Sequence, residues 1–393
     1  MPAARWNMAA ARRPRGRGML RRMPDVATHP PVVHIVGARP NFIKAAPVMR
    51  AMTALGLPQR LVHTGQHYDA QMSDVFFRDL DLPQPDVSLG VGSGSHAGQT
   101  ASLLTALEDV LVTADPATRP SLVMVYGDVN STLAAALVCA KTGIPFAHVE
   151  AGLRSFDMTM PEEVNRRVTD ILSDLLFVTS PEALDNLARE GVDLARCHFV
   201  GNPMIDTLLA HLARFDPAPL RARLRLVGPY AVATLHRPAN VDTLDAAARL
   251  VAALHMLAER LPIVLPLHPR GRATLTAAGL LDVPRLTVVD PLGYLEFLSL
   301  VRGSALVVTD SGGIQEETTI LGIPCLTLRP NTERPITISH GTNRLVEPDR
   351  LGEHVEAALR GELARPGDGP PLWDGHAGER IAALVADWLA ARA

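Results

Sequence analysis

The sequence has almost no lysine: two lysines stand beside 36 arginines in 393 residues. It has only three cysteines, Cys139, Cys197 and Cys325, which lie far apart in apolar segments. This spacing favours buried, reduced thiols over a disulfide framework or a zinc site, so we expect no metal. Because arginine fills nearly every basic position, Lys44 and Lys141 are each candidates for a role that arginine cannot take.

The chain also lacks a long apolar run and a secretory signal. No segment is long and apolar enough to cross a bilayer, so we expect a cytoplasmic protein that does not insert into a membrane. The first 22 residues hold seven arginines and no acid, and we expect residues 1–30 to be a disordered basic leader. An upstream start codon before Met19 or Met23 explains this leader more simply than a transit peptide. The rest of the chain is more acidic than the overall net charge of −3, which argues against nucleic-acid binding.

Short apolar runs alternate with helical patterns along both halves of the chain. Such runs predict parallel strands that are buried on both faces and connected by helices. We therefore predict an α/β fold of two Rossmann-like, doubly wound domains, over residues 31–205 and 206–375, with a last helix in 376–393 that packs on the first domain. The expected strands cover residues 32–37, 61–64, 122–126, 145–149, 176–179, 198–200, 231–235, 263–267, 286–289, 306–309 and 325–328.

The most distinctive motif is an apolar strand that runs into a serine, two glycines and a helix, at residues 308–317. Ser311, Gly312 and Gly313 would present backbone N–H groups and the positive end of the helix to an anion, which suits a diphosphate. Glu317, one turn further, would accept hydrogen bonds from the two ribose hydroxyls. The alternative is an ordinary tight turn between a strand and a helix.

A second turn of this kind follows the first strand. Arg39 can bind a phosphate with its forked guanidinium, and Lys44 lies about one turn up on the same helix. A solvated arginine and a surface lysine are the alternative.

Three acids follow strands or begin helices in the first half. Asp128 and Glu150 stand at the ends of neighbouring strands, and Glu162 follows in a Pro-Glu-Glu-Val-Asn-Arg segment. Carboxyl groups that meet in a partly dry cleft raise one another's pKa, which suits proton transfer near neutral pH. Helix capping is the alternative for Asp128. For Glu163, complementing the helix dipole is the better interpretation.

In the second half, His236 ends the first strand of the predicted second domain. Ligands of open parallel sheets bind at the carboxyl ends of strands, so His236 is a candidate for ligand binding and catalysis. His268 is placed similarly with less support. Phe297 precedes the glycine-rich strand and would lie against a nucleobase or pack in the core.

The chain has no G-x-S-x-G elbow, Walker A loop or dinucleotide fingerprint. Its motifs together resemble the non-hydrolysing UDP-N-acetylglucosamine 2-epimerases, which have two Rossmann-like domains in a GT-B-like arrangement with the active site between them. The resemblance runs through residues 37–48, 127–132, 148–154, 161–166, 201–206, 310–317 and 332–335.

This resemblance implies inversion at C2 of UDP-N-acetylglucosamine, through loss of UDP and its re-addition to a 2-acetamidoglucal, in support of cell-surface polysaccharide synthesis. It implies a homodimer that binds a UDP-sugar and needs no cofactor. By position, the family's active-site residues correspond to Arg39, Lys44, Asp128, Glu150, Glu162 and His236. Its UDP contacts correspond to Phe297, Ser311, Gly312, Gly313 and Glu317.

Three features depart from the family pattern. Asn41 and Ile336 each replace a glutamate that is common in the family. Many bacterial members are activated by a second substrate molecule near a segment that here covers residues 66–72 and lacks a basic residue. We therefore expect weak or absent substrate activation. A sigmoidal rate curve for the reverse reaction would contradict this expectation.

Several alternatives remain open. A GT-B glycosyltransferase would share the fold, and a hydrolysing epimerase would release free N-acetylmannosamine and UDP. A nucleotide-sugar sensor without activity would not need three acids. A 2-epimerase of a UDP-2,3-diacetamido-uronic acid is a close alternative, because such enzymes have a Gly-Ala-Arg-Pro-x-Phe-Ile-Lys turn like the one at residues 37–44 of this chain.

Overall fold

The computed structural model describes residues 30–66, 77–112, 115, 119–267, 269–363 and 367–392. The predicted basic leader, apart from Pro30, lies outside these residues. So do His268 and most of the segment expected to govern substrate activation. Among the helices of the described ranges, none has the length and apolar character needed to cross a bilayer.

The first domain is built on a parallel sheet of seven strands in the order β3-β2-β1-β4-β5-β6-β7. This order places the first strand in the middle, as in a doubly wound fold, and β1 and β4 are buried along their whole length. The strands are β1 (Val32–Val36), β2 (Gln59–His63), β3 (Val87–Ser88), β4 (Leu122–Tyr126), β5 (Phe146–Ala151), β6 (Leu175–Val178) and β7 (Cys197–Phe199).

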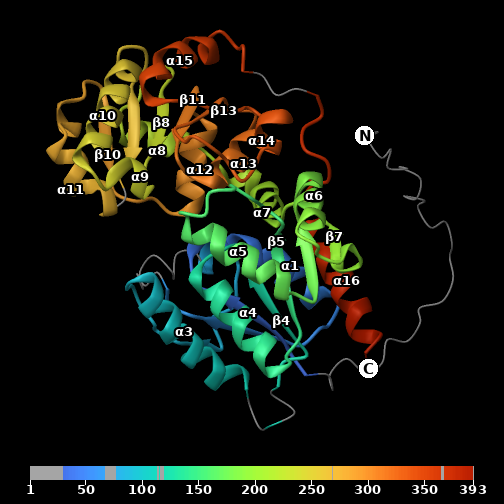
Figure 1. Ribbon diagram of the computed structural model, residues 1–393. Helices are drawn as coiled ribbons and strands as arrows, with labels where there is room; N and C mark the ends of the chain where they lie inside the picture. The colour runs from blue at the N-terminus through green and yellow to red at the C-terminus, as the bar shows by residue number, and fades with distance from the viewer. Residues whose placement is uncertain are drawn as a thin grey trace.

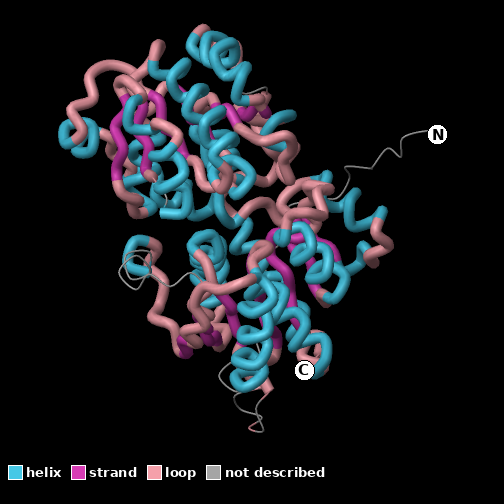
Figure 2. Tube along the Cα trace, turned by 60° about the vertical axis from the view of Figure 1, so that its left-hand side comes forward, coloured by secondary structure: helices cyan, strands magenta, loops and turns pink. Residues whose placement is uncertain are grey.

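Alternate side chains of β1 enter two different cores. Val33 and Ile35 pack against α3 and α4, whereas Val32 and Val36 pack in the core that contains α1 and α16. Both faces of the sheet are therefore covered by helices (Figure 2). The helices of this part are α1 (Arg39–Ala54), α3 (His96–Leu111), α4 (Asn130–Thr142), α5 (Pro161–Leu172), α6 (Pro181–Arg189) and α7 (Pro203–His211).

The second domain repeats the plan with six parallel strands in the order β10-β9-β8-β11-β12-β13. Its strands are β8 (Ala231–Thr234), β9 (Ile263–Pro266), β10 (Leu286–Val289), β11 (Leu306–Thr309), β12 (Cys325–Thr327) and β13 (Asn343–Leu345). Its helices are α8 (Ala218–Arg223), α9 (Pro238–Val241), α10 (Leu244–Ala258), α11 (Pro269–Ala277), α12 (Tyr294–Arg302), α13 (Gly312–Leu321), α14 (Ile336–Ser339) and α15 (Leu351–Leu359).

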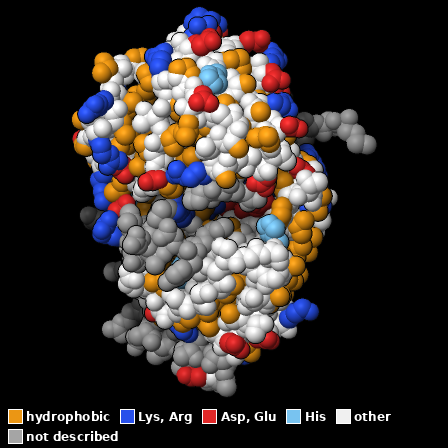
Figure 3. Space-filling view, turned by 90° about the vertical axis from the view of Figure 1, so that its left-hand side faces the viewer, with side chains coloured by type: hydrophobic (Ala, Val, Ile, Leu, Met, Phe, Trp, Pro, Cys, Tyr) orange, Lys and Arg blue, Asp and Glu red, His pale blue; other side chains and the backbone are white. Residues whose placement is uncertain are grey.

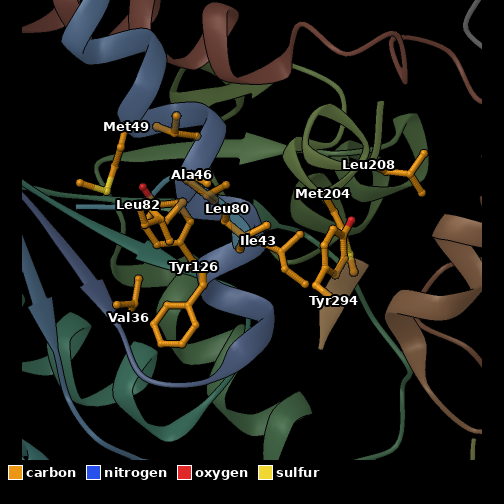
Figure 4. Packing of buried hydrophobic residues seen from close by; sticks show 14 of the residues in the cluster. Val36, Ile43, Ala46, Met49, Leu80, Leu82, Tyr126, Met204, Leu208 and Tyr294 are labelled. Carbon is orange, nitrogen blue, oxygen red and sulfur yellow. The ribbon is translucent and has the colours of Figure 1, made fainter. Parts of the chain in front are cut away.

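The two domains share an apolar core around α1 and α7. Ile43 and Tyr126 of the first domain belong to the same buried cluster as Met204 and Leu208 of α7 and Tyr294 of α12 (Figure 4). The last helix, α16 (Ala377–Ala390), packs against α1 and α7 of the first domain (Figure 1). On the face shown in Figure 3, a furrow lies between the two domains, with acidic and basic side chains near it.

Candidate active site

The turn after β4 holds Asp128 in a salt bridge. One carboxylate oxygen, Oδ2, accepts hydrogen bonds from the guanidinium of Arg166 on α5, and the side chain of Asp128 remains 25% exposed. Capping is not its role, because the N-cap residue of α4 is Val129. Burial raises the pKa of Asp128, but the charge of Arg166, with those of Lys44 and Arg334, outweighs it and lowers the pKa below its ordinary value.

Gly127 is required at this turn for two reasons. Its φ is +64°, in the left-handed region that favours glycine. A Cβ atom there would also lie 3.0 Å from Nζ of Lys44 and 3.2 Å from Oε2 of Glu150. The close approach of these two side chains to the backbone therefore places Asp128 beside them.

Glu150 lies near the end of β5 with a φ of +77°, where the pairing of β5 with β6 shifts register. Such a backbone is unusual for a residue other than glycine and often marks a functional position. Its carboxylate is buried between two cations: Nζ of Lys44 donates to Oε2, and a guanidinium nitrogen of Arg334 donates to Oε1 at 3.0 Å. Lys44 is thus a buried ion-pair partner and not a surface lysine.

Arg334 comes from the second domain and connects the two halves of the site. Besides Glu150, its guanidinium pairs with Glu316 of α13 at 3.0 Å and with Glu333. Asn202, at the start of α7, donates a hydrogen bond to Glu316 at 3.0 Å. The structure therefore brings Lys44, Glu150 and Arg334 into one buried network that spans both domains.

Glu162 and Glu163 have different environments in the first turn of α5. Glu162 is half-buried, whereas Glu163 is fully buried and accepts hydrogen bonds from the Ser155 backbone and hydroxyl at 2.9 Å. Glu163 also pairs with Arg166 at 2.6 Å. Glu163 lies in the first turn of α5, where it was expected to complement the helix dipole, and it also fixes the loop between β5 and α5 and supports the arginine that binds Asp128.

In the second domain, His236 follows β8, and its Nδ1 lies 3.0 Å from Oδ1 of the buried Asp310. Asp310 also accepts hydrogen bonds from the backbone N–H groups of His236 and Arg237. Burial raises the pKa of Asp310, but its bond with His236 and the other donors outweigh this, and the pKa is lowered. The His236 side chain is 40% exposed, so Asp310 orients a ring that solvent reaches.

The glycine-rich turn of the sequence joins β11 to α13. A Cβ atom on Gly312 would lie 2.5 Å from a guanidinium nitrogen of Arg334, and one on Gly313 would lie 2.6 Å from the methyl group of Met204. A side chain on Gly312 would therefore displace the paired guanidinium of Arg334, and one on Gly313 would displace the end of the Met204 side chain. Gly312 places the turn directly beside the network of Arg334. Ser311 is the N-cap residue of α13, and its side chain does not cap the helix.

Glu317 is fully buried on α13, beside the hydroxyl group of Tyr294. Burial, assisted by the charge of Glu316, raises the pKa of Glu317 to about 8. Burial raises the pKa of Glu316 to about 7, against the opposing charge of Arg334. Phe297 is half-buried and packs against the shared core.

The raised pKa of Glu317 predicts a dependence of stability on pH. The folded protein holds this proton up to about pH 8, and the unfolded chain loses it near the ordinary value of 4.5. The stabilisation is therefore full below pH 4.5 and is lost as the pH rises towards 8. Glu317→Gln should flatten this part of the curve of unfolding free energy against pH, by at least about 1 kcal/mol between pH 5 and 8.5. Urea titrations at several pH values test it, and curves that stay parallel would contradict it.

Two of the three departures from the family pattern, at Asn41 and Ile336, lie in residues that the structure describes. Oδ1 of Asn41 accepts from the backbone N–H groups of Gly37 and Ala38 at 3.0 Å, while its amide nitrogen donates to the carbonyl of Tyr126 at 2.7 Å. A carboxylate could not make this last bond, so the amide connects the turn before Arg39 to the end of β4. Ile336 is buried in a small apolar cluster with Ile205 and Trp373.

Four charged residues of the site were not predicted from the sequence: Arg166, Glu316, Glu333 and Arg334. Arg166 and Arg334 lie within segments that carry the family resemblance. An arginine close to acids in such a segment could have marked both residues as members of the site. Arg39, at the first turn of α1, is half-buried. Within the ranges that the structure describes, no group of three or more His, Cys, Asp or Glu side chains is arranged to hold a metal ion.

Comparisons with known proteins agree with this architecture. The family model of UDP-N-acetylglucosamine 2-epimerase matches residues 51–386. The UDP-N-acetylglucosamine 2-epimerase of Methanocaldococcus jannaschii is 39% identical over 363 residues, which cover 89% of this chain and 97% of that protein. The UDP-2,3-diacetamido-2,3-dideoxy-D-glucuronate 2-epimerase of Pseudomonas aeruginosa is 42% identical, and the alignment covers 90% of this chain and 99% of that protein.

Solved structures show the same fold. A crystal structure of the M. jannaschii UDP-GlcNAc 2-epimerase in complex with UDP-GlcNAc and UDP matches with a TM-score of 0.83 at 39% identity, covering 91% of this chain and 99% of that one. The Neisseria meningitidis enzyme bound to UDP-GlcNAc matches with a TM-score of 0.81 at 28% identity, with coverage of 91% and 99%. The predicted fold class, two Rossmann-like domains in a GT-B-like arrangement, is confirmed. The chain is an epimerase and belongs to the UDP-N-acetylglucosamine 2-epimerase family.

Proposed function

We propose that the protein interconverts UDP-N-acetylglucosamine and UDP-N-acetylmannosamine by inverting C2 of the sugar. The observation that carries the proposal is the convergence of Asp128 and Glu150, at the ends of adjacent strands, with Arg334 and the turn at Gly312 in the other domain. Acids that can move a proton thus lie opposite groups that can hold a diphosphate. This is the arrangement that elimination and re-addition of UDP requires.

In the forward half of the reaction, a carboxylate removes the C2 proton, the C2–H electron pair forms the C1–C2 double bond, and the C1–O bond breaks with its electrons on UDP. The products are a 2-acetamidoglucal and UDP. In the second half, UDP adds back to C1 while C2 receives a proton on its other face. These two steps need only carboxyl groups that accept the proton from C2 and return a proton to its other face.

Different environments support different roles for the acids. Both oxygens of Glu150 are bonded to cations, whereas Asp128 offers Oδ1 on a side chain that is 25% exposed. We assign Asp128 to direct proton exchange with the sugar, with Glu162 on the adjacent helix as the second proton carrier. Glu150 holds Lys44 and Arg334 in place and keeps the site charged.

The diphosphate is proposed to lie between Arg39 and the second domain. His236, with Nδ1 towards Asp310, would offer Nε2 to a phosphate oxygen, and Ser311 begins the helix whose positive end faces the anion. Phe297 and Glu317 are assigned to uracil and ribose by the family resemblance. These groups stabilise the charge that develops on UDP as it leaves.

A second candidate substrate is a UDP-2,3-diacetamido-uronic acid. It is supported by the 42% identity to the P. aeruginosa relative that is named for this sugar. We predict that kcat/KM for UDP-N-acetylglucosamine will exceed that for UDP-2,3-diacetamido-glucuronate by at least roughly tenfold, because the extra acetamido group and carboxylate need their own hydrogen-bond partners. Steady-state kinetics on both sugars measures the ratio, and an inverted ratio would assign the enzyme to the uronate.

Product analysis separates the remaining alternatives. With UDP-N-acetylglucosamine alone, an epimerase yields UDP-N-acetylmannosamine, a hydrolysing enzyme releases UDP and free N-acetylmannosamine, and a transferase leaves C2 unchanged. The proposal further includes a cytoplasmic homodimer that supplies polysaccharide synthesis, which the family resemblance supports. Analytical ultracentrifugation tests the dimer.

A further inference from the structure

A buried histidine lies beneath the acids and takes no direct part in the chemistry proposed above. His148 lies on β5, two residues before Glu150, and is 0% exposed. Its Nε2 lies 2.8 Å from the carbonyl oxygen of Gly127, and its Nδ1 lies 2.7 Å from Oδ1 of the equally buried Asp170.

These two contacts determine the protonation of the ring. A backbone carbonyl can only accept a hydrogen bond, so Nε2 must carry a proton. Oδ2 of Asp170 accepts hydrogen bonds from the backbone N–H of Gly152 and from the guanidinium of Arg154, and these donors favour the ionised carboxylate, so that Oδ1 also only accepts. Both ring nitrogens therefore donate, and His148 is an imidazolium paired with a carboxylate inside the protein.

A buried ion pair is costly unless all of its hydrogen-bonding capacity is used. Here it is used: Oδ2 of Asp170 accepts from the backbone N–H of Gly152 at 3.0 Å and from the guanidinium of Arg154 at 2.7 Å. Arg154 is anchored in turn by Glu190. The charged groups that face the pair are therefore Arg154 and, behind it, Glu190.

The partners of the pair flank both catalytic turns. Gly127 directly precedes Asp128, and Gly152 follows Glu150 by two residues. Asp170 itself belongs to α5, the helix whose first turn contains Glu162. The His148–Asp170 pair is thus hydrogen-bonded to the turn that carries Asp128 and to the residues that follow Glu150. Through Asp170, it is also part of the helix that carries Glu162.

We propose that His148 and Asp170 are positioning residues, whose hydrogen bonds set the mutual placement of Asp128, Glu150 and Glu162 for proton transfer at C2. The inference rests on the proposed function. It predicts that breaking either bond of His148 lowers kcat while the UDP contacts of the second domain, and hence KM, remain nearly unchanged.

Two substitutions separate the two bonds of the ring. In His148→Asn, the side-chain amide takes the approximate place of Nδ1, so the bond to Asp170 is kept and the bond to Gly127 is lost. In His148→Gln, the longer amide takes the place of Nε2 and keeps only the bond to Gly127. Each should lower kcat for UDP-N-acetylglucosamine about 10- to 100-fold, the expected cost of misplacing a catalytic group by an ångström or less. KM should stay within about threefold.

A third variant is the conservative rescue. In Asp170→Asn, the amide nitrogen can donate to Nδ1 of a neutral ring while its oxygen still accepts from Gly152 and Arg154. All of the positional bonds survive, so kcat should stay within about threefold of the wild type. Asp170→Ala removes them and should resemble the His148 variants.

His34→Asn is the matched control for a purely structural effect. His34 is also 0% exposed, lies on β1 of the same sheet, and bonds through Nδ1 to the hydroxyl of Tyr126 at 2.7 Å. It should reduce Tm as much as His148→Asn does while leaving kcat within about twofold of wild type. Full kcat in both His148 variants, or an equal loss of kcat in His34→Asn, would overturn the proposal.

The protonation of His148 can be measured without enzymatic activity, so this test does not depend on the proposed function. Nitrogen-15 spectra of histidine-labelled protein should show both His148 nitrogens protonated in the wild type, and one protonated in Asp170→Asn. A neutral His148 in the wild type would overturn the pair. If the wild type epimerises no UDP-sugar, the proposed function fails, and these spectra still decide whether the pair exists.

Discussion

Glu150→Gln will lower kcat for C2 epimerisation by roughly a hundredfold, because Lys44 and Arg334 lose the carboxylate that holds them beside Asp128. Glutamine has almost the same shape as glutamate, so the change removes charge and little volume. Lys44 then loses its buried carboxylate partner, and Arg334 keeps only the carboxylates of its own domain. Asp128→Asn should cause a loss of the same order, because the remaining oxygen of the amide is a poor base.

Steady-state kinetics and urea unfolding of the two variants test this expectation. Glu353→Gln is a suitable control, because Glu353 makes a salt bridge to Arg350 on the surface, with both side chains at least 65% exposed. It should change neither kcat nor stability measurably. Near-normal rates in both Glu150→Gln and Asp128→Asn would refute the assignment of the acids.

Arg334→Met should have the largest effect on stability and should also abolish most activity. Its guanidinium is buried among Glu150, Glu316 and Glu333, and three carboxylates would lose their common partner. Removing one partner of a buried ion pair costs about 3–5 kcal/mol, and the loss of this charge would raise the pKa of Glu316 further. We therefore expect a loss of unfolding free energy in this range at pH 8 and a smaller loss at pH 5.5, where more of the carboxyl groups are protonated.

Arg350→Met supplies the comparison for Arg334→Met, with an expected loss below about 1 kcal/mol because its salt bridge is exposed. The double variant Arg334→Met with Glu150→Gln should lose less stability than the sum of the two single variants, since the second change removes a charge that the first leaves uncompensated. Strictly additive losses would show that the two residues do not interact across the domains.

Most of the fold could be predicted because the strands are buried on both faces. Runs of apolar residues at 122–126, 286–289 and 306–309 coincide with β4, β10 and β11, and the other predicted strands differ by one to two residues at one or both ends. The short strands β3 (Val87–Ser88) and β13 (Asn343–Leu345) were not predicted. Both lie at sheet edges and are only two or three residues long, so no periodicity marks them.

The candidate site could be predicted only where it follows from the position of strand ends. That rule found Asp128, Glu150 and His236, and the structure joins Glu150 to Lys44 as well. It could not find Arg334, because this residue lies after a loop and meets Glu150 only when the two domains pack together. The pairing depends on tertiary contacts between residues 184 positions apart, which leave no pattern in the local sequence.

The glycine-rich turn shows the same limit. Its sequence predicts a phosphate site. The structure gives a second reason for the two glycines, because Arg334 and Met204 approach the backbone closely at Gly312 and Gly313. Binding of UDP at this turn therefore stays a prediction. For Asn41, the sequence predicted the turn in which it lies but not its hydrogen-bond partners. The structure shows that these partners are Gly37, Ala38 and Tyr126.

The central claim is that carboxyl groups at the junction of the two domains exchange the C2 proton of a UDP-sugar while UDP leaves and returns. Proton NMR of UDP-N-acetylglucosamine with the wild-type protein in deuterium oxide tests it most directly. We predict loss of the C2 proton signal through exchange with solvent, together with the appearance of the manno isomer as a UDP-sugar. A folded protein that yields neither exchange at C2 nor the manno isomer would contradict the account.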